Sequence, residues 1–275
     1  PARLRDAPPP CTRCSMIIAT WNINGIKARL EVLVAWLKEA SPDVVCLQEI
    51  KSVDENFPGA AIEELGYNVA THGQKGFNGV AILSKRPFDE LIPRLPGDDD
   101  DEQARYLEAV ISGDEGAVRV ASIYLPNGNP VDTEKYPYKL AWMDRLIAHA
   151  QDRLALEEPL VLAGDYNVIP QDGDCYSAAA WADDALALPQ SRERFRTLLG
   201  LGLTDALRAV TPEEGIYTFW DYQAGAWQRN NGIRIDHLLL SPQAADRLRA
   251  CDIDKAMRGR EKPSDHVPVW AELEF

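Results

Sequence analysis

The stretch SPDVVCLQEIK (residues 41–51) shows the pattern from which the fold can be read. A proline precedes the apolar run VVCLQ, which predicts a buried β-strand, and an acidic residue follows it directly. Glu49 therefore stands at a strand end, where its carboxylate can project from the sheet edge into a cleft as a metal ligand would. The competing interpretation is a strand-end acid that pairs with Lys51 or faces water.

The same pattern recurs in three further motifs, each beside an apolar run. They are WNINGIKA (residues 21–28), GDYNVIP (residues 164–170) and SDHVPV (residues 264–269). Carboxylate oxygens are suitable ligands for Mg²⁺, amide groups can orient neighbouring groups by hydrogen bonds, and an imidazole can carry a proton. The set therefore fits metal-assisted hydrolysis of a phosphate ester. The side chains that the four motifs bring forward are Asn22, Asn24, Glu49, Asp165, Asn167, Asp265 and His266.

Short β-strands alternate with helices along the chain. Apolar residues at helical spacing predict helices over residues 30–40 and roughly 133–154, and SGDEGA (residues 112–117) predicts a hairpin-like turn. This order favours an α/β fold with two stacked sheets covered by helices. Strands are expected at residues 17–21, 44–48, 67–71, 80–84, 105–111, 118–125, 160–163, 235–240, 251–255 and 267–275.

The beginning of the chain differs from the rest. Residues 1–15, PARLRDAPPPCTRCS, are proline-rich without an apolar core, so we expect no secretory signal there. They are either a disordered leader or a non-native remnant that precedes a natural start at Met16. No linker interrupts residues 16–275, and the motifs come from both halves, which predicts a single domain. No apolar run approaches the roughly 20 residues that span a bilayer. Five scattered cysteines, an odd number, favour a reducing cytoplasm.

The charge balance argues against a broad DNA-binding face. Net charge is −14, with a pI near 4.8, whereas such a face is basic. The acidic run at residues 98–102 and the carboxylates of the expected metal site account for part of the excess. The balance predicts modest DNA affinity that weakens steeply with salt. Two small basic groups remain, most of whose charges we expect to be solvated: Arg192, Arg194 and Arg196, and Arg258, Arg260 and Lys262.

Spacing within the motifs suggests how the polar groups divide their work. Asp165 and Asn167 stand two residues apart, so on extended backbone they face the same way; an Asx turn is the competing interpretation. Asp236 enters an apolar strand, where its burial requires a partner such as an imidazole. Asp265 and His266 would point to opposite faces of a strand, one toward metal and one toward a phosphate oxygen. Taken alone, His266 is as consistent with a structural role as with a catalytic one.

In conjunction, the motifs resemble the exonuclease III family of apurinic/apyrimidinic endonucleases, within the endonuclease/exonuclease/phosphatase superfamily. The resemblance runs over residues 16–275 and includes GQKGFNGVAILSK (residues 73–85), YLPNG (residues 124–128), YTFWDY (residues 217–222) and NNGIRIDHLLLS (residues 230–241). It implies a deoxyribonuclease I-like, four-layer α/β sandwich of two mixed sheets flanked by helices. It also implies an enzyme that needs Mg²⁺, for which Mn²⁺ is the alternative because oxygen ligands suit both ions. Its substrate would be double-stranded DNA, incised 5′ to abasic sites or trimmed at blocked 3′ ends. A monomer is the default expectation, since no sequence feature indicates an oligomer.

The resemblance also implies roles for individual residues. Glu49 corresponds to the principal metal ligand, with Asp265, Asn22 and Asn24 close by; some relatives carry an aspartate at the last position. Catalysis would rest on Asp165, helped by Asn167, to activate water, on His266 with Asp236 to stabilise the phosphate, and on Tyr124 to contact the scissile phosphate or leaving group. Substrate binding would fall to Lys51, Asn127, Asn129, Phe219, Trp220, Ile233 and Ile235.

Two other functions compete with DNA repair. The first is hydrolysis of a non-DNA phosphoester, such as a phosphoinositide or lipid head group, which suits the acidic net charge. The second is a catalytically inactive DNA-binding module on the same scaffold, which we would expect to have lost some of the catalytic side chains. For the pocket residues, ordinary core packing is the competing interpretation.

Overall fold

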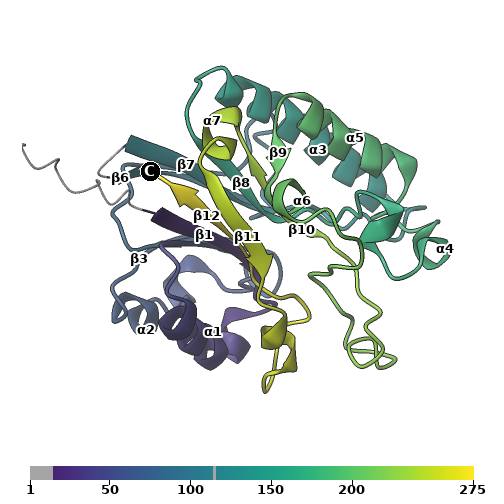
Figure 1. Cartoon of the computed structure of the whole chain (residues 1–275), viewed down its shortest axis with the longest axis horizontal. Coiled ribbons are helices and arrows are strands. Elements are labelled where there is room, and N and C mark those ends of the chain that lie inside the picture. The colour runs from purple at the N-terminus through teal and green to yellow at the C-terminus, as the bar shows by residue number, and fades with distance from the viewer. Residues whose placement is uncertain (1–14, 114–115) are drawn as a thin grey trace, which may run out of the picture.

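A computed structural model describes residues 15–113 and 116–275, and places them in two mixed β-sheets flanked by helices (Figure 1). Each sheet has six strands within these residues, which confirms the expected architecture. The first has the order β11-β12-β1-β2-β4-β3: β1 (Ser15–Asn22), β2 (Val44–Gln48), β3 (Asn68–His72), β4 (Val80–Ser84), β11 (Leu248–Ile253) and β12 (Val269–Glu274). The second has the order β5-β6-β7-β8-β10-β9: β5 (Glu90–Pro93), β6 (Tyr106–Gly113), β7 (Gly116–Tyr124), β8 (Leu160–Asp165), β9 (Thr204–Asp205) and β10 (Asp236–Leu240).

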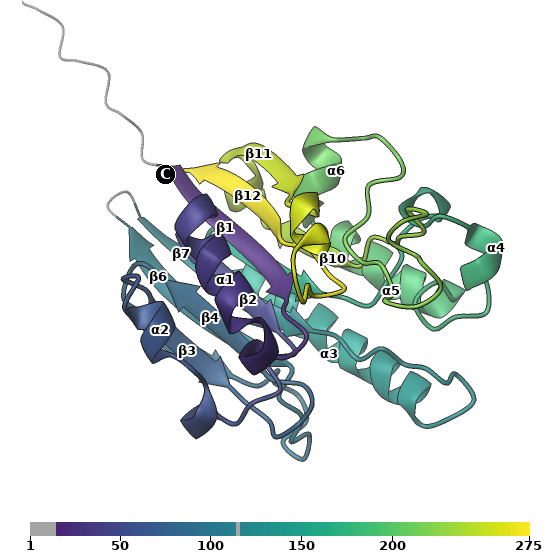
Figure 2. The same ribbon diagram turned by 90° about the horizontal axis from the view of Figure 1, so that it is seen from below.

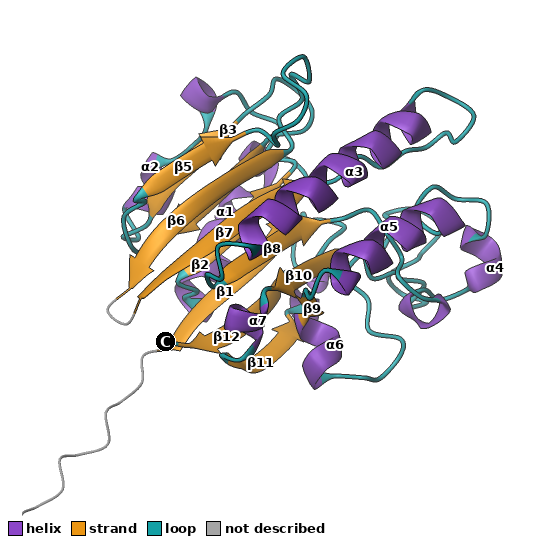
Figure 3. Ribbon diagram, turned by 90° about the horizontal axis from the view of Figure 1, so that it is seen from above, coloured by secondary structure: helices purple, strands orange, loops and turns teal. Residues whose placement is uncertain are grey.

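A parallel pair of strands lies at the centre of each sheet. β1 and β2 are joined through α1 (Ile26–Ala40), and β7 and β8 through α3 (Lys135–Leu154), because parallel neighbours need a long crossover. Figures 2 and 3 show α1 and α2 over the outer face of the first sheet, and α3 and α5 over that of the second. The remaining helices are α2 (Ala60–Glu63), α4 (Ala178–Trp181), α5 (Pro189–Gly200), α6 (Ala206–Val210) and α7 (Pro242–Ala245), with 3₁₀ turns η1 (Asp54–Asn56), η2 (Asp172–Asp174) and η3 (Lys255–Gly259).

Apolar side chains fill the spaces between the layers. Ile18 of the first sheet and Val161 of the second belong to one buried cluster between the sheets. Trp36 of α1 packs beneath that helix on Trp21, and Trp142 of α3 fills the space over the second sheet. Burial on both sheet faces explains why the central strands read as nearly continuous apolar runs.

Several element bounds differ from those expected. The first helix begins at Ile26 instead of residue 30, because buried Ile26 lies one turn before Leu30. β12 begins at Val269 instead of residue 267, since Pro268 has no N–H for the ladder. β11 spans Leu248–Ile253 instead of residues 251–255, because Lys255 already opens η3. β6 and β7 pair antiparallel up to Gly113 and Gly116, as the expected hairpin requires; residues 114 and 115 of its turn lie outside the described residues.

The proposed leader lies almost wholly outside the described residues, which begin at Ser15. That residue, expected in the leader, belongs instead to β1 and pairs with Glu274. Among the residues that the structure describes, no helix combines the length and apolar character needed to cross a membrane.

Candidate active site

The topology gathers the polar ends of several strands at one edge of the stacked sheets. β1 and β2 run parallel, so Asn22 and the residue after Gln48 emerge together. In the second sheet, Asp165 is in register with Tyr124 of parallel β7 and with Asp236 of antiparallel β10. Sequence positions more than a hundred residues apart therefore meet in one place, as the motif pattern predicted.

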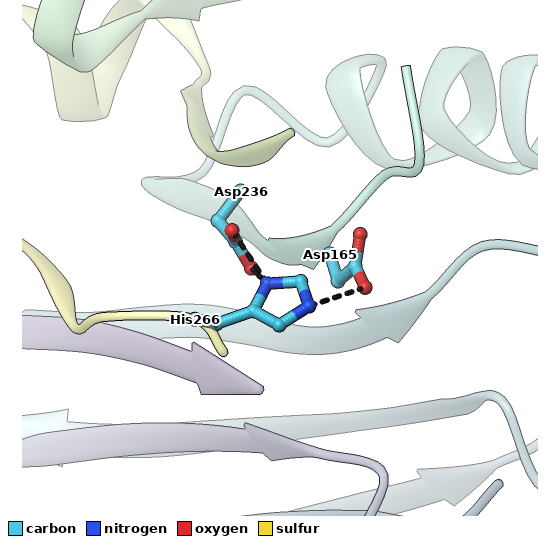
Figure 4. Close-up of side chains that lie close together, drawn as sticks. All are labelled: Asp165, Asp236 and His266. Carbon is cyan, nitrogen blue, oxygen red and sulfur yellow. Dashed lines mark hydrogen bonds and ion pairs between the residues drawn. The ribbon is translucent and has the colours of Figure 1, made fainter. Parts of the chain in front are cut away.

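His266 lies between two buried carboxylates (Figure 4). Its Nδ1 is 2.9 Å from Asp236 Oδ2, and its Nε2 is 3.8 Å from Asp165 Oδ2. Thr218 Oγ1 donates to Asp236 at 2.6 Å and holds that carboxylate from the other side. His237 points away and contacts Arg234 and the Val168 carbonyl, so the imidazole partner of Asp236 is His266, as expected.

Burial and charge oppose each other at this cluster. Burial alone would lower the pKa of His266, but the negative charges of Asp236 and Asp165 outweigh it and raise the pKa well above its ordinary value. Burial and the charge of Asp236 also raise the pKa of Asp165, while His266 and a hydrogen bond from Asn22 pull it back. The arrangement therefore combines a cationic imidazole with a carboxylate that binds a proton more readily than usual.

A second polar group centres on Glu49, which has left-handed backbone (φ 50°) directly after β2. Its Oε1 accepts from Asn22 Nδ2 at 3.0 Å, and its Oε2 pairs with Lys51 Nζ at 2.9 Å. Asn24 links Lys51, at 2.5 Å, to Asp265, at 2.9 Å. The pairing with Lys51 that we weighed as an alternative is thus present, within a larger network.

The donor set fits a hard divalent cation. Burial opposes ionisation of Glu49, yet hydrogen bonds from Asn22 and Lys51 leave its pKa lowered, so it is anionic. Glu49 and Asp265 offer carboxylate oxygens of the type that Mg²⁺ prefers. Asn22 instead turns its amide nitrogen to Glu49 and Asp165, and its oxygen accepts from the Asn24 main chain, so it orients these carboxylates.

Another group among the described residues could also hold a metal. Ligand atoms of Asp165, Asp236 and His266 lie within 4.8 Å of one another. Because Asp236 already engages His266 Nδ1, this arrangement suits proton handling at least as well as metal binding.

Asn167 stands beside Asp165 through a turn, not through extended backbone. Its φ is 47°, and its main-chain N–H donates to Asp165 Oδ1 at 2.9 Å, which is the Asx-type bond weighed as the alternative. Its amide donates to the Leu125 carbonyl at 2.9 Å and accepts from Asn127 Nδ2 at 3.0 Å. The expected proximity is present, but the reason we gave for it was wrong.

Tyr124 ends β7 next to both acidic groups. Burial, followed by the charges of Glu49 and Asp165, raises its pKa well above the ordinary value, so the phenol stays protonated and can donate. Arg105 lies 4.9 Å from the centre of its ring. A neutral phenol at this place can donate to a phosphate or leaving-group oxygen.

A cleft of about 280 Å³ opens beside these groups. Phe219, Ile233 and Ile235 line it, as do Asn127 and Asn129, all predicted from the sequence. Two other predicted contacts lie elsewhere: Trp220 is fully buried against Tyr217 and Trp227, and Lys51 sits on Glu49 outside the cleft lining. Core packing, the competing interpretation, therefore holds for Trp220.

Sequence reasoning missed part of the cleft wall. Trp181, Asp184 and Leu186 also line it, brought in by α4 and the turn that follows. No motif marks them. An Asn129–Asp184 hydrogen bond of 3.0 Å attaches this segment to the loop after β7, a contact that only the tertiary structure reveals.

The two basic groups noted in the sequence are largely used within the protein. Arg192 pairs with Asp172, Arg194 with Asp144 and Arg260 with Glu39. Buried Arg258 donates to the Trp220 carbonyl at 3.0 Å. These contacts engage four of the six charges, and the exposed Arg196 and Lys262 are not among them.

This fold and this site define a class of hydrolase, and sequence comparison places the chain within it. The model of the endonuclease/exonuclease/phosphatase family matches residues 19–266, so the chain belongs to that family. Within the family, it belongs with exonuclease III. It is 35% identical over 266 residues to exodeoxyribonuclease III of Haemophilus influenzae, covering 94% of this chain and 100% of that protein.

Solved structures agree with this assignment. An AP endonuclease from Archaeoglobus fulgidus superimposes with a TM-score of 0.90 at 38% identity, covering 94% of this chain and all of that chain. The 3′ phosphatase NExo from Neisseria, bound to a product DNA hairpin, gives 0.91 at 40% identity with 94% of this chain and 100% of that chain covered. Both are similar over nearly the whole molecule.

Proposed function

We propose that this protein is a Mg²⁺-dependent DNA-repair phosphodiesterase that incises DNA 5′ to abasic sites and trims blocked 3′ ends. One observation carries the proposal: the buried Asp165–His266–Asp236 array faces a cleft with an apolar wall of Phe219, Ile233 and Ile235. An apolar wall beside phosphate chemistry suits a flipped sugar that lacks its base. The names of the relatives, an exodeoxyribonuclease, an AP endonuclease and a 3′ phosphatase, support the same substrate class.

The proposed mechanism divides the work among the groups at the cleft. Asp165, whose pKa burial raises, would accept the proton of the attacking water, with Asn167 donating to a phosphate oxygen. Cationic His266, held by Asp236, would stabilise the negative charge that develops on the phosphate. Tyr124 would donate toward the leaving oxygen. A divalent cation held by Glu49 and Asp265 would supply further charge neutralisation.

The choice of Mg²⁺, with Mn²⁺ as a substitute, follows from the oxygen donors, since both ions accept them. We also propose that the protein acts as a monomer and that residues 16–275 form one domain. We assign it to a reducing cytoplasm. That compartment is supported by Cys46, Cys175 and Cys251, which are all free thiols buried in the fold.

The net charge of −14 favours one alternative, hydrolysis of a phosphoester other than DNA. It is tested beside the main proposal. The inactive-module interpretation gains no support, because Glu49, Asp165, Asp236 and His266 are present and assembled.

The deciding experiment follows cleavage of a labelled duplex that carries one tetrahydrofuran abasic analogue, with Mg²⁺ or with EDTA. An intact duplex and soluble inositol phosphates serve as comparison substrates. We expect metal-dependent incision 5′ to the analogue, and slower loss of nucleotides from 3′ ends. Turnover of inositol phosphates without incision, in Mg²⁺ or Mn²⁺ at low salt, would overturn the proposal.

A further inference from the structure

Lys139 of α3 is a fully buried lysine directly behind the candidate active site. Its Nζ donates to the main-chain carbonyl of Asn127 at 3.0 Å and to that of Asn167 at 2.5 Å. Among the ion pairs of the described residues, none includes this ammonium group. Burying an ammonium group costs free energy unless the group is hydrogen-bonded. The two hydrogen bonds to main-chain carbonyls therefore explain how the protein tolerates a lysine at this position.

The two carbonyls belong to the two loops that carry the cleft amides. One loop follows β7 and contains Asn127 and Asn129, and the other follows β8 and contains Asn167. On the cleft side, Asn127 Nδ2 donates to Asn167 Oδ1 at 3.0 Å. Lys139 therefore joins the backbones of the same two residues whose side chains are joined in the cleft.

Gly128 gives the lysine stem its room. The backbone there has φ of 90°, and a Cβ at this position would lie 2.6 Å from Lys139 Cδ. Any residue other than glycine would have a strained backbone conformation at this position, and its Cβ would clash with this methylene group. The loop after β7 is thus shaped around Lys139.

The lysine amine also interacts electrostatically with two carboxylates of the site. Burial lowers the pKa of Lys139 to about 7, while the negative charges of Asp165 and Asp184 act in the opposite direction. Asp165 is the proposed acceptor of the water proton, and Asp184 lines the cleft. The attraction between the protonated amine and Asp165 favours the charged form of the lysine.

We propose that Lys139 is a positioning residue that fixes the loops after β7 and β8, so that Asn127 and Asn167 present their amides to the scissile phosphate. The inference rests on the proposed phosphodiesterase function for its catalytic consequence. Its structural consequence, immobile loops, stands apart from activity.

The first experiment measures loop order without any substrate. Hydrogen exchange at the backbone amides of residue 125 and residues 127–129 in the first loop, and of residues 165–169 in the second, is compared in wild type, Lys139→Met and Lys139→Arg. Methionine keeps the volume but cannot donate, so both loops should exchange about 10-fold faster or more, while arginine should stay near wild type. Lys38→Met, which removes an exposed lysine of α1, is the matched control and should change neither loop.

Unchanged exchange in both loops of Lys139→Met would overturn the proposal. So would equal acceleration across β6 and the rest of the core, since that pattern means general destabilisation. If Lys139→Met does not fold, Lys139→Gln is measured in the same way, with the same two outcomes.

The second experiment uses the abasic duplex and separates kcat from KM. Lys139→Met should lower kcat about 10- to 100-fold with KM nearly unchanged, and Lys139→Arg should restore kcat. A wild-type kcat in folded Lys139→Met, or a loss that lies in KM alone, would refute the positioning role. A wild-type protein that cleaves no DNA would instead refute the proposed function, and the exchange result would still decide the role of Lys139.

Discussion

Asn22 links the two sheets at the centre of the site: its Nδ2 is 2.9 Å from Asp165 Oδ2, although 143 residues separate the two in sequence. The same nitrogen lies 3.0 Å from Glu49 Oε1, so one amide orients both the proposed metal ligand and the proposed proton acceptor. Ser264 Oγ in turn holds the Asn22 carbonyl at 2.7 Å. The proposed metal ligand and the proposed proton acceptor thus share one orienting side chain.

Removing that link should lower activity without unfolding the protein. In Asn22→Ala both carboxylates lose an orienting donor, so we expect kcat to fall about 10- to 100-fold. Steady-state cleavage of the abasic duplex checks this, with Asn68→Ala on the distant strand β3 as the control. A kcat within about 2-fold of wild type would show that Asn22 only packs.

Asp236→Asn should change the pH dependence of the reaction. The charge of Asp236 does most to raise the pKa of His266, so its removal lowers that pKa. If the imidazolium is the active form, the alkaline decline of kcat should begin about one pH unit lower or more. Superimposable pH–rate profiles of Asp236→Asn and wild type would contradict a cationic role for His266. Asp172→Asn, at an exposed carboxylate paired with Arg192, should leave the profile unchanged.

Glu49→Gln should weaken divalent-cation binding. The amide keeps the shape but removes the carboxylate whose pKa the network holds down. Calorimetric titration with Mn²⁺ should show an affinity loss of at least about 10-fold, and cleavage in Mg²⁺ should fall with it. The exposed Glu55→Gln in η1 is the control. Equal Mn²⁺ affinity in both variants would show that Glu49 is not a metal ligand.

Glu108 should make the free energy of unfolding depend on pH in the acidic range. Burial raises its pKa, but hydrogen bonds from His149, Tyr106 and Arg119 prevail and lower it from 4.5 to about 2. A depressed folded-state pKa contributes stability above the unfolded-state value and loses it as pH falls toward 2, here on the order of 3 kcal/mol. Urea unfolding at pH 7 and pH 3 measures the greater part of this loss, about 2 kcal/mol.

Glu108→Gln should remove most of that dependence. At pH 7 it should also destabilise the fold by about 3–5 kcal/mol, because it leaves Arg119 buried without its main partner. Glu90→Gln, which removes an exposed partner of the same arginine, should cost much less. Equal effects of the two substitutions would show that burial of Glu108 is unimportant.

Much of the site could be predicted because its residues share a local signature. Glu49, Asp165 and Asp236 each stand where an apolar strand meets a polar segment, and strand ends meet at a sheet edge whatever the details of packing. The fold class followed from the same alternation of strands and helices. The sequence pattern therefore indicated which strand ends would come together at the candidate site.

Other parts of the site had no such signature. Trp220 matched a pocket position, but its neighbours Tyr217 and Trp227 turn it into the core, a choice made by tertiary packing. Lys139 reads as an ordinary helix lysine until its two carbonyl partners are seen. The backbone conformation of Asn167 could not be predicted either. Its φ is positive, in the left-handed region, and the spacing of residues along the chain does not indicate the sign of φ.

The antiparallel pairing of β12 with β1 has a consequence for biosynthesis. Asp265 and His266 come just before β12, whereas Asn22 and Glu49 are translated more than 200 residues earlier. A ribosome-bound chain that has not yet reached residue 266 lacks both this imidazole and the strand β12 that pairs with β1. The proposed catalytic group is therefore incomplete until this late segment has been made and has docked on the first strand.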